Sequence, residues 1–257
     1  MSNPKTLAIV QARMSSTRFP GKVLADLQGK PMVIQQLERI SQSQSLDAIV
    51  VATSTDASDD QLVEVLNSFG YTTVRGDLDD VLERFILAIN MYQPEVVVRL
   101  TADCPLTSPR VIDEVVAAFH ASQADYLSNT MTPTFPDGLD VEVVKADVLR
   151  EVAKASTDQP EREHVTLGVY RRNDQYQIEN FAQPDDLSDL RWTVDTSEDF
   201  AFVQKIYSEL FPSNPNFDLP DILRHLEAHP ELSRTQADAP RNAALQGLDT
   251  GAMNANG

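Results

Sequence analysis

The residues best placed to do chemistry lie near the start of the chain, in a polar loop at residues 11–22 that carries Arg13, Arg18 and Lys22. The loop directly follows an apolar run at residues 7–10 and closes with a proline and a glycine. In an open parallel sheet, ligands bind outside the carboxyl ends of strands, and cations at that edge bind phosphate. The loop therefore predicts a polyphosphate site. The alternative is a surface loop with solvated arginines.

Two aspartates follow strand-like segments farther along the chain. Asp103 comes just after the apolar residues 96–100, and Asp195 comes just after residues 191–194. A bound nucleoside triphosphate is ordinarily joined by Mg²⁺, which proteins hold through one or two carboxylates. Since both aspartates are expected at the same sheet edge as the basic loop, we expect Asp103 and Asp195 to hold Mg²⁺.

Each aspartate also has a structural alternative. Asp103 stands two residues before a proline, where an aspartate commonly begins a turn. Asp195 precedes a helix that Thr196 is able to cap, with Asp199 in its first turn to favour the helix dipole. Capping explains Asp199 better than it explains Asp195.

Composition narrows the class of partner. The chain has 257 residues, of which 39 are acidic and 21 basic, giving a formal charge of −18. Nucleic acid and anionic membranes require an extended basic face, so neither is an expected partner. The single cysteine, Cys104, excludes an internal disulfide, and neither a secretory pattern nor an apolar run of about 20 residues is present. We expect a cytoplasmic protein.

The elements that must position these residues alternate along the chain. Strand-like runs at residues 7–10, 48–52, 96–100 and 125–127 alternate with helical patterns at residues 32–41, 60–69, 81–91 and 110–121. The strands are apolar without strict alternation, which is typical of burial on both faces. The pattern predicts an α/β protein with a doubly wound, mostly parallel Rossmann-like sheet.

After residue 129 the rhythm changes to a turn-rich passage and a predicted strand at residues 139–144, which we expect to form a small β-containing insertion. Further helices are predicted at residues 161–170, 197–210 and 220–229, and strands at residues 177–181 and 191–194. We expect one domain over residues 1–230. Residues 231–257 lack apolar periodicity and are expected to be a disordered tail.

Two further segments carry polar side chains of interest. Asp137, Asp140 and Glu142 lie around Gly138, which permits a close approach, so their carboxylates are candidates to accept hydrogen bonds from the hydroxyls of a ligand. The alternative is a simple hairpin or edge strand. His164 either contacts a carboxylate or a metal-bound group of a ligand, or is a hydrogen-bonded histidine at a helix.

Six segments in order resemble the cytidylyltransferase family that activates sugar acids, including the Kdo and acylneuraminate cytidylyltransferases. Most closely they resemble its branch of spore coat polysaccharide biosynthesis protein F. The segments are IVQARMSSTRFPGKVL (9–24), GDLDDVLERF (76–85), VVRLTADCPL (97–106), DGLDVEVV (137–144), EREHVT (161–166) and RWTVDTSEDF (191–200). The resemblance spans residues 5–210.

The resemblance implies a fold of the nucleotide-diphospho-sugar transferase type and a reaction in which a sugar-acid hydroxyl attacks the α-phosphorus of CTP and releases pyrophosphate. By analogy, the catalytic set would be Arg13, Arg18, Lys22 and Asp103, with Mg²⁺ on Asp103 and Asp195. The nucleotide would also contact Ala12, Arg99, Thr101 and Ala102, while Asp137, Asp140, Glu142 and His164 would meet the sugar. Related enzymes suggest a homodimer.

Two other functions remain open. A glycosyltransferase of similar architecture would hold its metal through Asp77 and Asp79, although an aspartate there equally well begins the helix at residues 81–91. A relative that binds nucleotide or sugar without turnover is the third possibility. The nucleotidyltransferase fits best, because only it requires three cations in the first loop.

Overall fold

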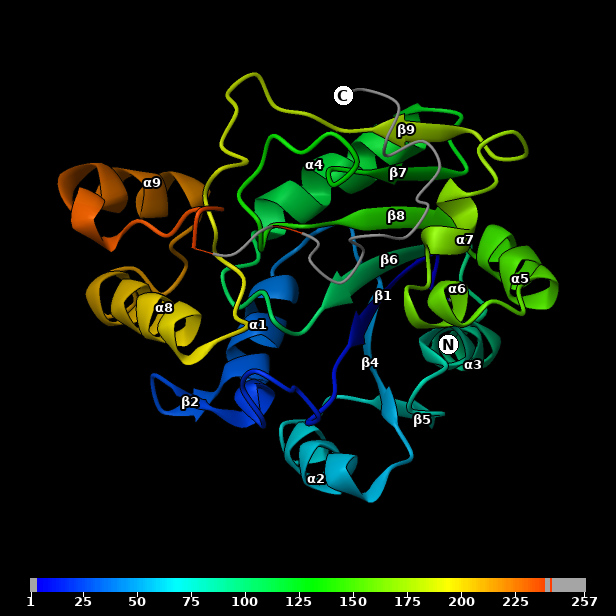
Figure 1. Ribbon diagram of the computed structural model, residues 1–257, viewed down its shortest axis with the longest axis horizontal. Helices are drawn as coiled ribbons and strands as arrows, with labels where there is room; N and C mark the ends of the chain where they lie inside the picture. The colour runs from blue at the N-terminus through cyan, green and yellow to red at the C-terminus, as the bar shows by residue number, and fades with distance from the viewer. Residues whose placement is uncertain (1–3, 239–240, 242–257) are drawn as a thin grey trace.

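A seven-stranded sheet forms the centre of the computed structural model, which describes residues 4–238 and 241 (Figure 1). Its spatial order is β5-β4-β1-β6-β8-β7-β9. The strands are β1 (Thr6–Gln11), β4 (Ala48–Ser54), β5 (Thr73–Gly76), β6 (Val96–Thr101), β7 (Tyr126–Ser128), β8 (Glu142–Lys145) and β9 (Ile178–Asn180). Strands β5, β4, β1 and β6 are parallel, whereas β8 is antiparallel to both β6 and β7. The doubly wound, mostly parallel sheet is confirmed.

Strand β1 lies inside the sheet because its side chains are apolar on both faces. Ala8 and Val10 belong to the apolar core on one face, and Leu7 and Ile9 belong to the core on the other. All four side chains are fully buried. A run without polar alternation is what a strand covered by helices on both sides requires.

Helices cover both faces of the sheet (Figure 1). One face packs against α1 (Met32–Ile40), α2 (Asp60–Ser68), α4 (Pro109–Ala121), α8 (Ser197–Leu210) and α9 (Leu219–Ala228). The other packs against α3 (Val81–Tyr92), α5 (Ala146–Ala155) and α7 (Leu167–Tyr170), with α6 (Gln159–Glu163) beside α3. A short hairpin of β2 (Asp26–Leu27) and β3 (Lys30–Pro31) precedes α1.

Three elements differ from the sequence-based expectation. The strand expected within a separate insertion is β8, which pairs inside the main sheet between β6 and β7. The helix expected at residues 161–170 is split into α6 and α7, because Val165 between them adopts a left-handed conformation with φ 45°. Residues 191–194 form no strand; Leu190 and Arg191 make only isolated bridges. The periodicity of apolar residues in a sequence does not show where a helix is interrupted or which strand pairs with which.

The segment after α9 continues to make contacts with the domain. A 3₁₀ turn, η3 (Pro230–Leu232), follows α9, and Thr235 then forms a bridge to Leu190. The Arg191 N–H donates to the carbonyl of Arg234 at 2.8 Å. Disorder expected from residue 231 onward stays a prediction for residues 239–240 and 242–257, which lie outside the described residues.

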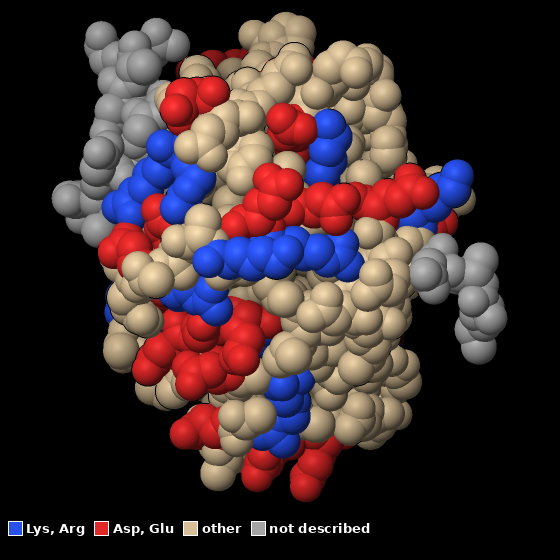
Figure 2. Space-filling model, turned by 90° about the vertical axis from the view of Figure 1, so that its right-hand side faces the viewer, with Lys and Arg blue, Asp and Glu red and all other residues tan. Residues whose placement is uncertain are grey.

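The molecular surface mixes the two signs of charge. On the face in Figure 2, Lys and Arg side chains lie between Asp and Glu side chains and form no extended basic surface. Among the helices that the structure describes, none is long and apolar enough to span a membrane.

Candidate active site

A cavity of about 400 Å³ lies at the carboxyl ends of β1 and β6, where the basic loop, the Asp103 turn and the α6–α7 junction meet. It is lined by Gln11, Ala12, Arg13, Ser15, Ser16, Thr17, Arg18, Lys22, Val23, Val81, Arg84, Thr101, Ala102, Asp103, Glu163, His164 and Asp195. The three loop cations and the two aspartates expected at the phosphates and the metal, Arg13, Arg18, Lys22, Asp103 and Asp195, therefore line one cavity.

Backbone contacts hold the basic loop over this cavity. The Met14 N–H donates to Oδ1 of the buried Asp59 at 2.7 Å, and the Gly21 N–H donates to the Met14 carbonyl at 3.1 Å. Gly21 has a φ of 72°, a left-handed conformation that costs glycine little, and it begins the 3₁₀ turn η1 (Lys22–Leu24). The loop thus folds back so that Lys22 points inward while Arg13 and Arg18 remain exposed.

Lys22 joins the two aspartates expected to hold a metal. Its Nζ lies 3.1 Å from Oδ1 of Asp195 and 3.4 Å from Oδ2 of Asp103, and it donates to the Val194 carbonyl at 2.6 Å. Burial by itself would lower the pKa of Lys22, but Asp103 and Asp195 outweigh it and raise the pKa above its usual value. Lys22 therefore stays protonated and neutralises both carboxylates.

Asp103 is fixed by its own neighbourhood at the end of β6. The Thr101 hydroxyl donates to Asp103 Oδ1 at 2.5 Å. Burial opposes ionisation of Asp103, but Lys22 and the Thr101 hydroxyl outweigh it and lower the pKa of the carboxyl below its usual value. By contrast, burial and the nearby Asp103 raise the pKa of the Cys104 thiol well above its usual value, so Cys104 is unsuited to act as a nucleophile.

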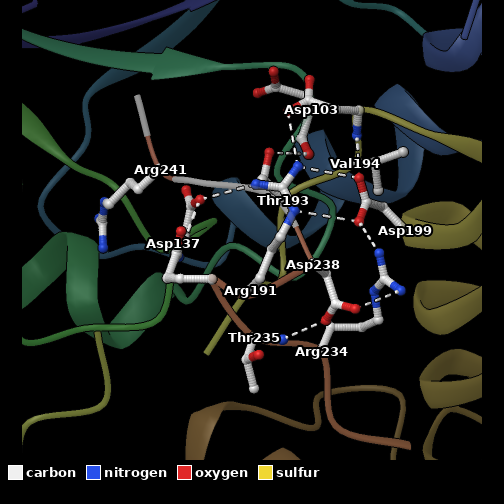
Figure 3. Close-up of polar contacts among 12 residues, drawn as sticks. Asp103, Asp137, Arg191, Thr193, Val194, Asp199, Arg234, Thr235, Asp238 and Arg241 are labelled. Carbon is white, nitrogen blue, oxygen red and sulfur yellow. Dashed lines mark hydrogen bonds and ion pairs between the residues drawn. The ribbon is translucent and has the colours of Figure 1, made fainter. Parts of the chain in front are cut away.

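Asp195 is held by a buried arginine, Arg191, which contacts three aspartates. Figure 3 shows Arg191 with two of them, Asp137 and Asp199. The guanidinium lies 2.9 Å from Asp195, 3.1 Å from Asp199 and 3.2 Å from Asp137, and its side chain is 2% exposed. Arg18 reaches the same Asp195 carboxylate from the basic loop at 3.1 Å. Sequence spacing alone did not identify Arg191 as this central residue.

The capping alternative for Asp195 is resolved by α8. Thr196 caps the helix, and Asp199 completes the capping box by accepting from the Thr196 N–H at 3.1 Å. Asp195 is not needed for that cap, and its carboxylate lines the cavity. The start of α8 is therefore capped by Thr196 and Asp199, and Asp195 takes no part in the cap.

The donor set at this point fits a hard divalent cation. Two carboxylates from separate segments, Asp103 and Asp195, converge on one position, which the Lys22 ammonium occupies. Mg²⁺ typically binds one or two carboxylates and completes its shell with water and substrate phosphate. Within residues 4–238 and 241, no three acidic, histidine or cysteine side chains form a complete metal cage.

The residues expected near the base are divided. Ala12, Thr101 and Ala102 line the cavity, but Arg99 does not. Arg99 instead donates from Nε to Gln11 Oε1 at 3.2 Å and forms an ion pair with the buried Glu142. Arg99 therefore reaches the cavity wall through its hydrogen bond to Gln11.

The residues expected at the sugar are also divided. His164 lines the cavity, and burial lowers its pKa. Asp137, Asp140 and Glu142 do not line it, and each carboxylate forms an ion pair with an arginine: Arg191, Arg241 and Arg99, respectively. Their role as sugar acceptors stays a prediction.

The close approach expected at Gly138 is present, but it is made by another part of the chain. Gly138 has a φ of 113°, and a Cβ there would lie 2.7 Å from the Thr193 nitrogen. The glycine thus lets residue 137 pair with Arg191 in a parallel bridge. In this way it helps to place Asp137 against the guanidinium.

Glu142 is the centre of a buried polar network. Its Oε2 accepts from the hydroxyls of Tyr126, Thr166 and Tyr170 at 2.8, 2.6 and 2.6 Å. Burial opposes the charge of Glu142, yet Arg99 and these hydroxyls lower its pKa below the usual value. The network ties β6 and β8 to the α6–α7 junction that carries His164.

The acidic pair that a glycosyltransferase would use has structural tasks. Asp77 Oδ1 accepts from the N–H groups of Asp79 and Asp80 at 2.8 and 3.0 Å, which closes a turn. Asp80 then caps α3 through the Glu83 N–H. Neither Asp77 nor Asp79 lines the cavity.

Eight cavity residues were not named as site residues from the sequence, and three of them have long polar side chains: Gln11, Arg84 and Glu163. Gln11 ends the strand before the basic loop, and Arg84 and Glu163 stand inside the GDLDDVLERF and EREHVT segments. Arg84 and Glu163 could have been proposed as site residues because they belong to segments that resemble the family. Helical spacing alone places an arginine on a helix and does not show that it faces a ligand site.

Comparison with known proteins agrees with this geometry. A family model described as cytidylyltransferase matches residues 7–240. An uncharacterized protein of Methanocaldococcus jannaschii is 34% identical over 91% of this chain and 95% of its own. The spore coat polysaccharide biosynthesis protein SpsF of Bacillus subtilis is 31% identical over 88% and 96%. A 3-deoxy-manno-octulosonate cytidylyltransferase of Geobacter sulfurreducens is 37% identical over 43% of each chain.

A solved cytidylyltransferase from Leptospira borgpetersenii superposes with a TM-score of 0.84 at 28% identity, covering 89% of this chain and 96% of its own. The family match begins within β1 and extends ten residues past the expected boundary at residue 230, through the segment that contacts Arg191. The family match, the relatives and the superposition agree, and the chain belongs to the cytidylyltransferase family.

Proposed function

We propose that this protein transfers CMP from CTP to a hydroxyl of a sugar acid and releases pyrophosphate, in the biosynthesis of a cell-surface polysaccharide. The observation that carries the proposal is the convergence of Asp103, Asp195 and Lys22 beside Arg13 and Arg18 in one cavity. The names of two relatives, a 3-deoxy-manno-octulosonate cytidylyltransferase and a spore coat polysaccharide biosynthesis protein, support the substrate class.

The residues divide the work by charge. Arg13, Arg18 and Lys22 offset the negative charge of the triphosphate, which otherwise repels an incoming oxygen. Asp103 and Asp195 would hold Mg²⁺, which when bound supplies charge neutralisation at the phosphate that is attacked. The nucleophile is the hydroxyl of the substrate, so no covalent enzyme residue is required. His164 and Glu163 form the wall on the α6 side, where the sugar acid would bind.

The base site is expected where the backbone of β1 and β6 ends. Ala12 and Ala102 are buried, and their N–H groups donate to Ala52 and Gln11 at 3.0 Å, which fixes the backbone there. Thr101 lines the same wall. A rigid backbone surface of this kind suits recognition of a flat pyrimidine. A homodimer and a cytoplasmic location remain predictions.

The test is pyrophosphate release with Mg²⁺, each of four nucleoside triphosphates and a panel of Kdo-like and sialic-acid-like sugars. We expect release with CTP and one class of sugar acid. Release with another triphosphate would contradict the assignment of the base. Absence of release throughout, together with transfer of sugar from a CMP-sugar to an acceptor, would instead favour the glycosyltransferase.

A further inference from the structure

The cations of the cavity fall into two pairs with opposite surroundings. Lys22 and Arg18 each contact Asp195, and Lys22 also contacts Asp103. Arg13 and Arg84 have no carboxylate within 4 Å among the described residues. The cavity therefore has an aspartate end, whose cations are paired, and an arginine end, defined by Arg13 and Arg84, whose cations are not.

Arg84 is the more unusual member of the second pair because it is buried. It lies in the first turn of α3, is 1% exposed and borders the cavity. Among the described residues, its guanidinium makes one hydrogen bond, from Nη2 to the Leu78 carbonyl at 3.0 Å, and its buried Nε has no partner there. A guanidinium offers five N–H donors, so most of its capacity is unused.

The nearest carboxylates cannot supply the missing partner. Asp59 already accepts four hydrogen bonds, from Met14, Thr53 and, twice, Ser54. Asp77 closes a turn, and Asp80 pairs with Arg162. These acids already hold the basic loop and the start of α3, so the positive charge of Arg84 has no carboxylate partner among the described residues.

Position makes the charge costly in the ligand-free protein. A cation near a helix N-terminus opposes the helix dipole, and a buried ion without a partner carries a desolvation cost. Burial lowers the pKa of Arg84, and the neighbouring Arg13 is the next largest cause. Arg13 and Arg84 thus line one cavity, and neither forms an ion pair within the described residues, an arrangement that a bound anion would stabilise.

We propose that Arg84, together with Arg13, binds the β- and γ-phosphates of the nucleoside triphosphate, the part that leaves as pyrophosphate. The proposal rests on the proposed function and extends it by dividing the cavity. The α-phosphate binds at the aspartate end, and the terminal phosphates bind at the arginine end. Two guanidiniums match a group with several negative charges better than they match a single carboxylate, and they give bidentate contacts to phosphate oxygens.

The test compares two buried arginines by calorimetric titration with inorganic pyrophosphate, CTP and CMP. In Arg84→Met, affinity for pyrophosphate and CTP should fall roughly tenfold to a hundredfold, as for loss of hydrogen bonds to a charged group. Affinity for CMP, which lacks the terminal phosphates, should change less than about twofold. Retained CMP binding also shows that the variant is folded. Unchanged pyrophosphate affinity would overturn the proposal.

Arg39 provides the matched control. It is also a buried helical arginine, but it donates to the carbonyls of Thr107 and Phe217 at 2.8 and 2.9 Å and stacks over the Phe217 ring. Arg39→Met should lower the melting temperature of the ligand-free protein and leave pyrophosphate affinity unchanged. Arg84→Met should leave the ligand-free melting temperature unchanged or raise it, because it removes an unpaired buried charge.

The two readouts separate a binding role from a structural one. A fall in melting temperature in Arg84→Met with normal pyrophosphate binding would make Arg84 a structural residue and refute the proposal. If the wild type binds pyrophosphate through Arg84 yet releases none from any triphosphate, the anion site stands and the proposed function fails. If CTP is turned over and pyrophosphate affinity ignores Arg84, the function stands and the proposed anion site fails.

Discussion

The two ends of the cavity hold similar side chains in different states of pairing. At the aspartate end, Arg191 is 2% exposed and contacts three carboxylates, and Lys22 bridges two. At the arginine end, Arg84 is 1% exposed and has no carboxylate within 4 Å in the described part of the chain. Paired charges fix carboxylates in place before a ligand arrives, whereas unpaired charges leave binding capacity for the ligand itself.

The largest expected effect comes from removing one charge at the aspartate end. Asp103→Asn and Asp195→Asn should each lower turnover by about a hundredfold or more, since even the outer partners of metal ligands are worth about 10- to 100-fold. Steady-state pyrophosphate release measures this effect. Asp185→Asn, at an exposed loop position, is the control. Wild-type rates in both site variants would remove the metal assignment.

The next effect concerns the arginine that organises the same end. Arg191→Met should lower the free energy of unfolding by about 3–5 kcal/mol, because it leaves buried carboxylates without their cation. Arg224→Met, whose side chain is 73% exposed, should change it by less than about 0.5 kcal/mol. Urea denaturation of both variants provides the comparison. Equal stabilities would show that Arg191 does not hold the aspartate end.

A pH effect tests the carboxylates that lie next to this end. Burial raises the pKa of Asp140 to about 7, although Arg241 opposes the rise. Between about pH 4 and pH 7 the unfolded chain has lost this proton while the folded protein retains it, so the stability contributed by Asp140 falls as the pH rises. In Asp140→Asn that fall should disappear. Urea denaturation from pH 4 to pH 8 compares the slopes; identical slopes would contradict a raised pKa.

The smallest expected effect is at the exposed edge of the basic loop. The Arg18 side chain is 51% exposed and shares Asp195 with Lys22 and Arg191, so Arg18→Ala should raise the KM for CTP by about two- to fivefold. Initial rates at varied CTP concentration measure this change. Rates should be more sensitive to salt in the wild type than in the variant. A KM that does not change would place Arg18 outside the nucleotide site.

The sequence was informative where residues that could bind a ligand directly follow a segment with a clear strand pattern. Apolar runs without alternation predicted a sheet buried on both faces, and in a parallel sheet each strand end falls at a known edge. For that reason the basic loop after β1 and Asp103 after β6 were expected to meet, and both line one cavity. The resemblance carried by six ordered segments predicted the family that the comparisons support.

Sequence spacing could not predict which charged side chains form ion pairs, because the partners come from segments that meet only after folding. Lys22 meets Asp103 and Asp195 across 81 and 173 positions of sequence. The same applies to Asp137, Asp140 and Glu142, which looked free in the sequence and have arginine partners in the structure.

The amino-acid sequence by itself therefore determined the type of sheet, the basic loop and the family, since these follow from residue type and order along the chain. The tertiary structure decided which charges are neutralised and which stay unpaired. Arg84 and Arg191 are the same residue type, and only the distances to surrounding carboxylates distinguish an arginine that holds the site together from one left for a ligand.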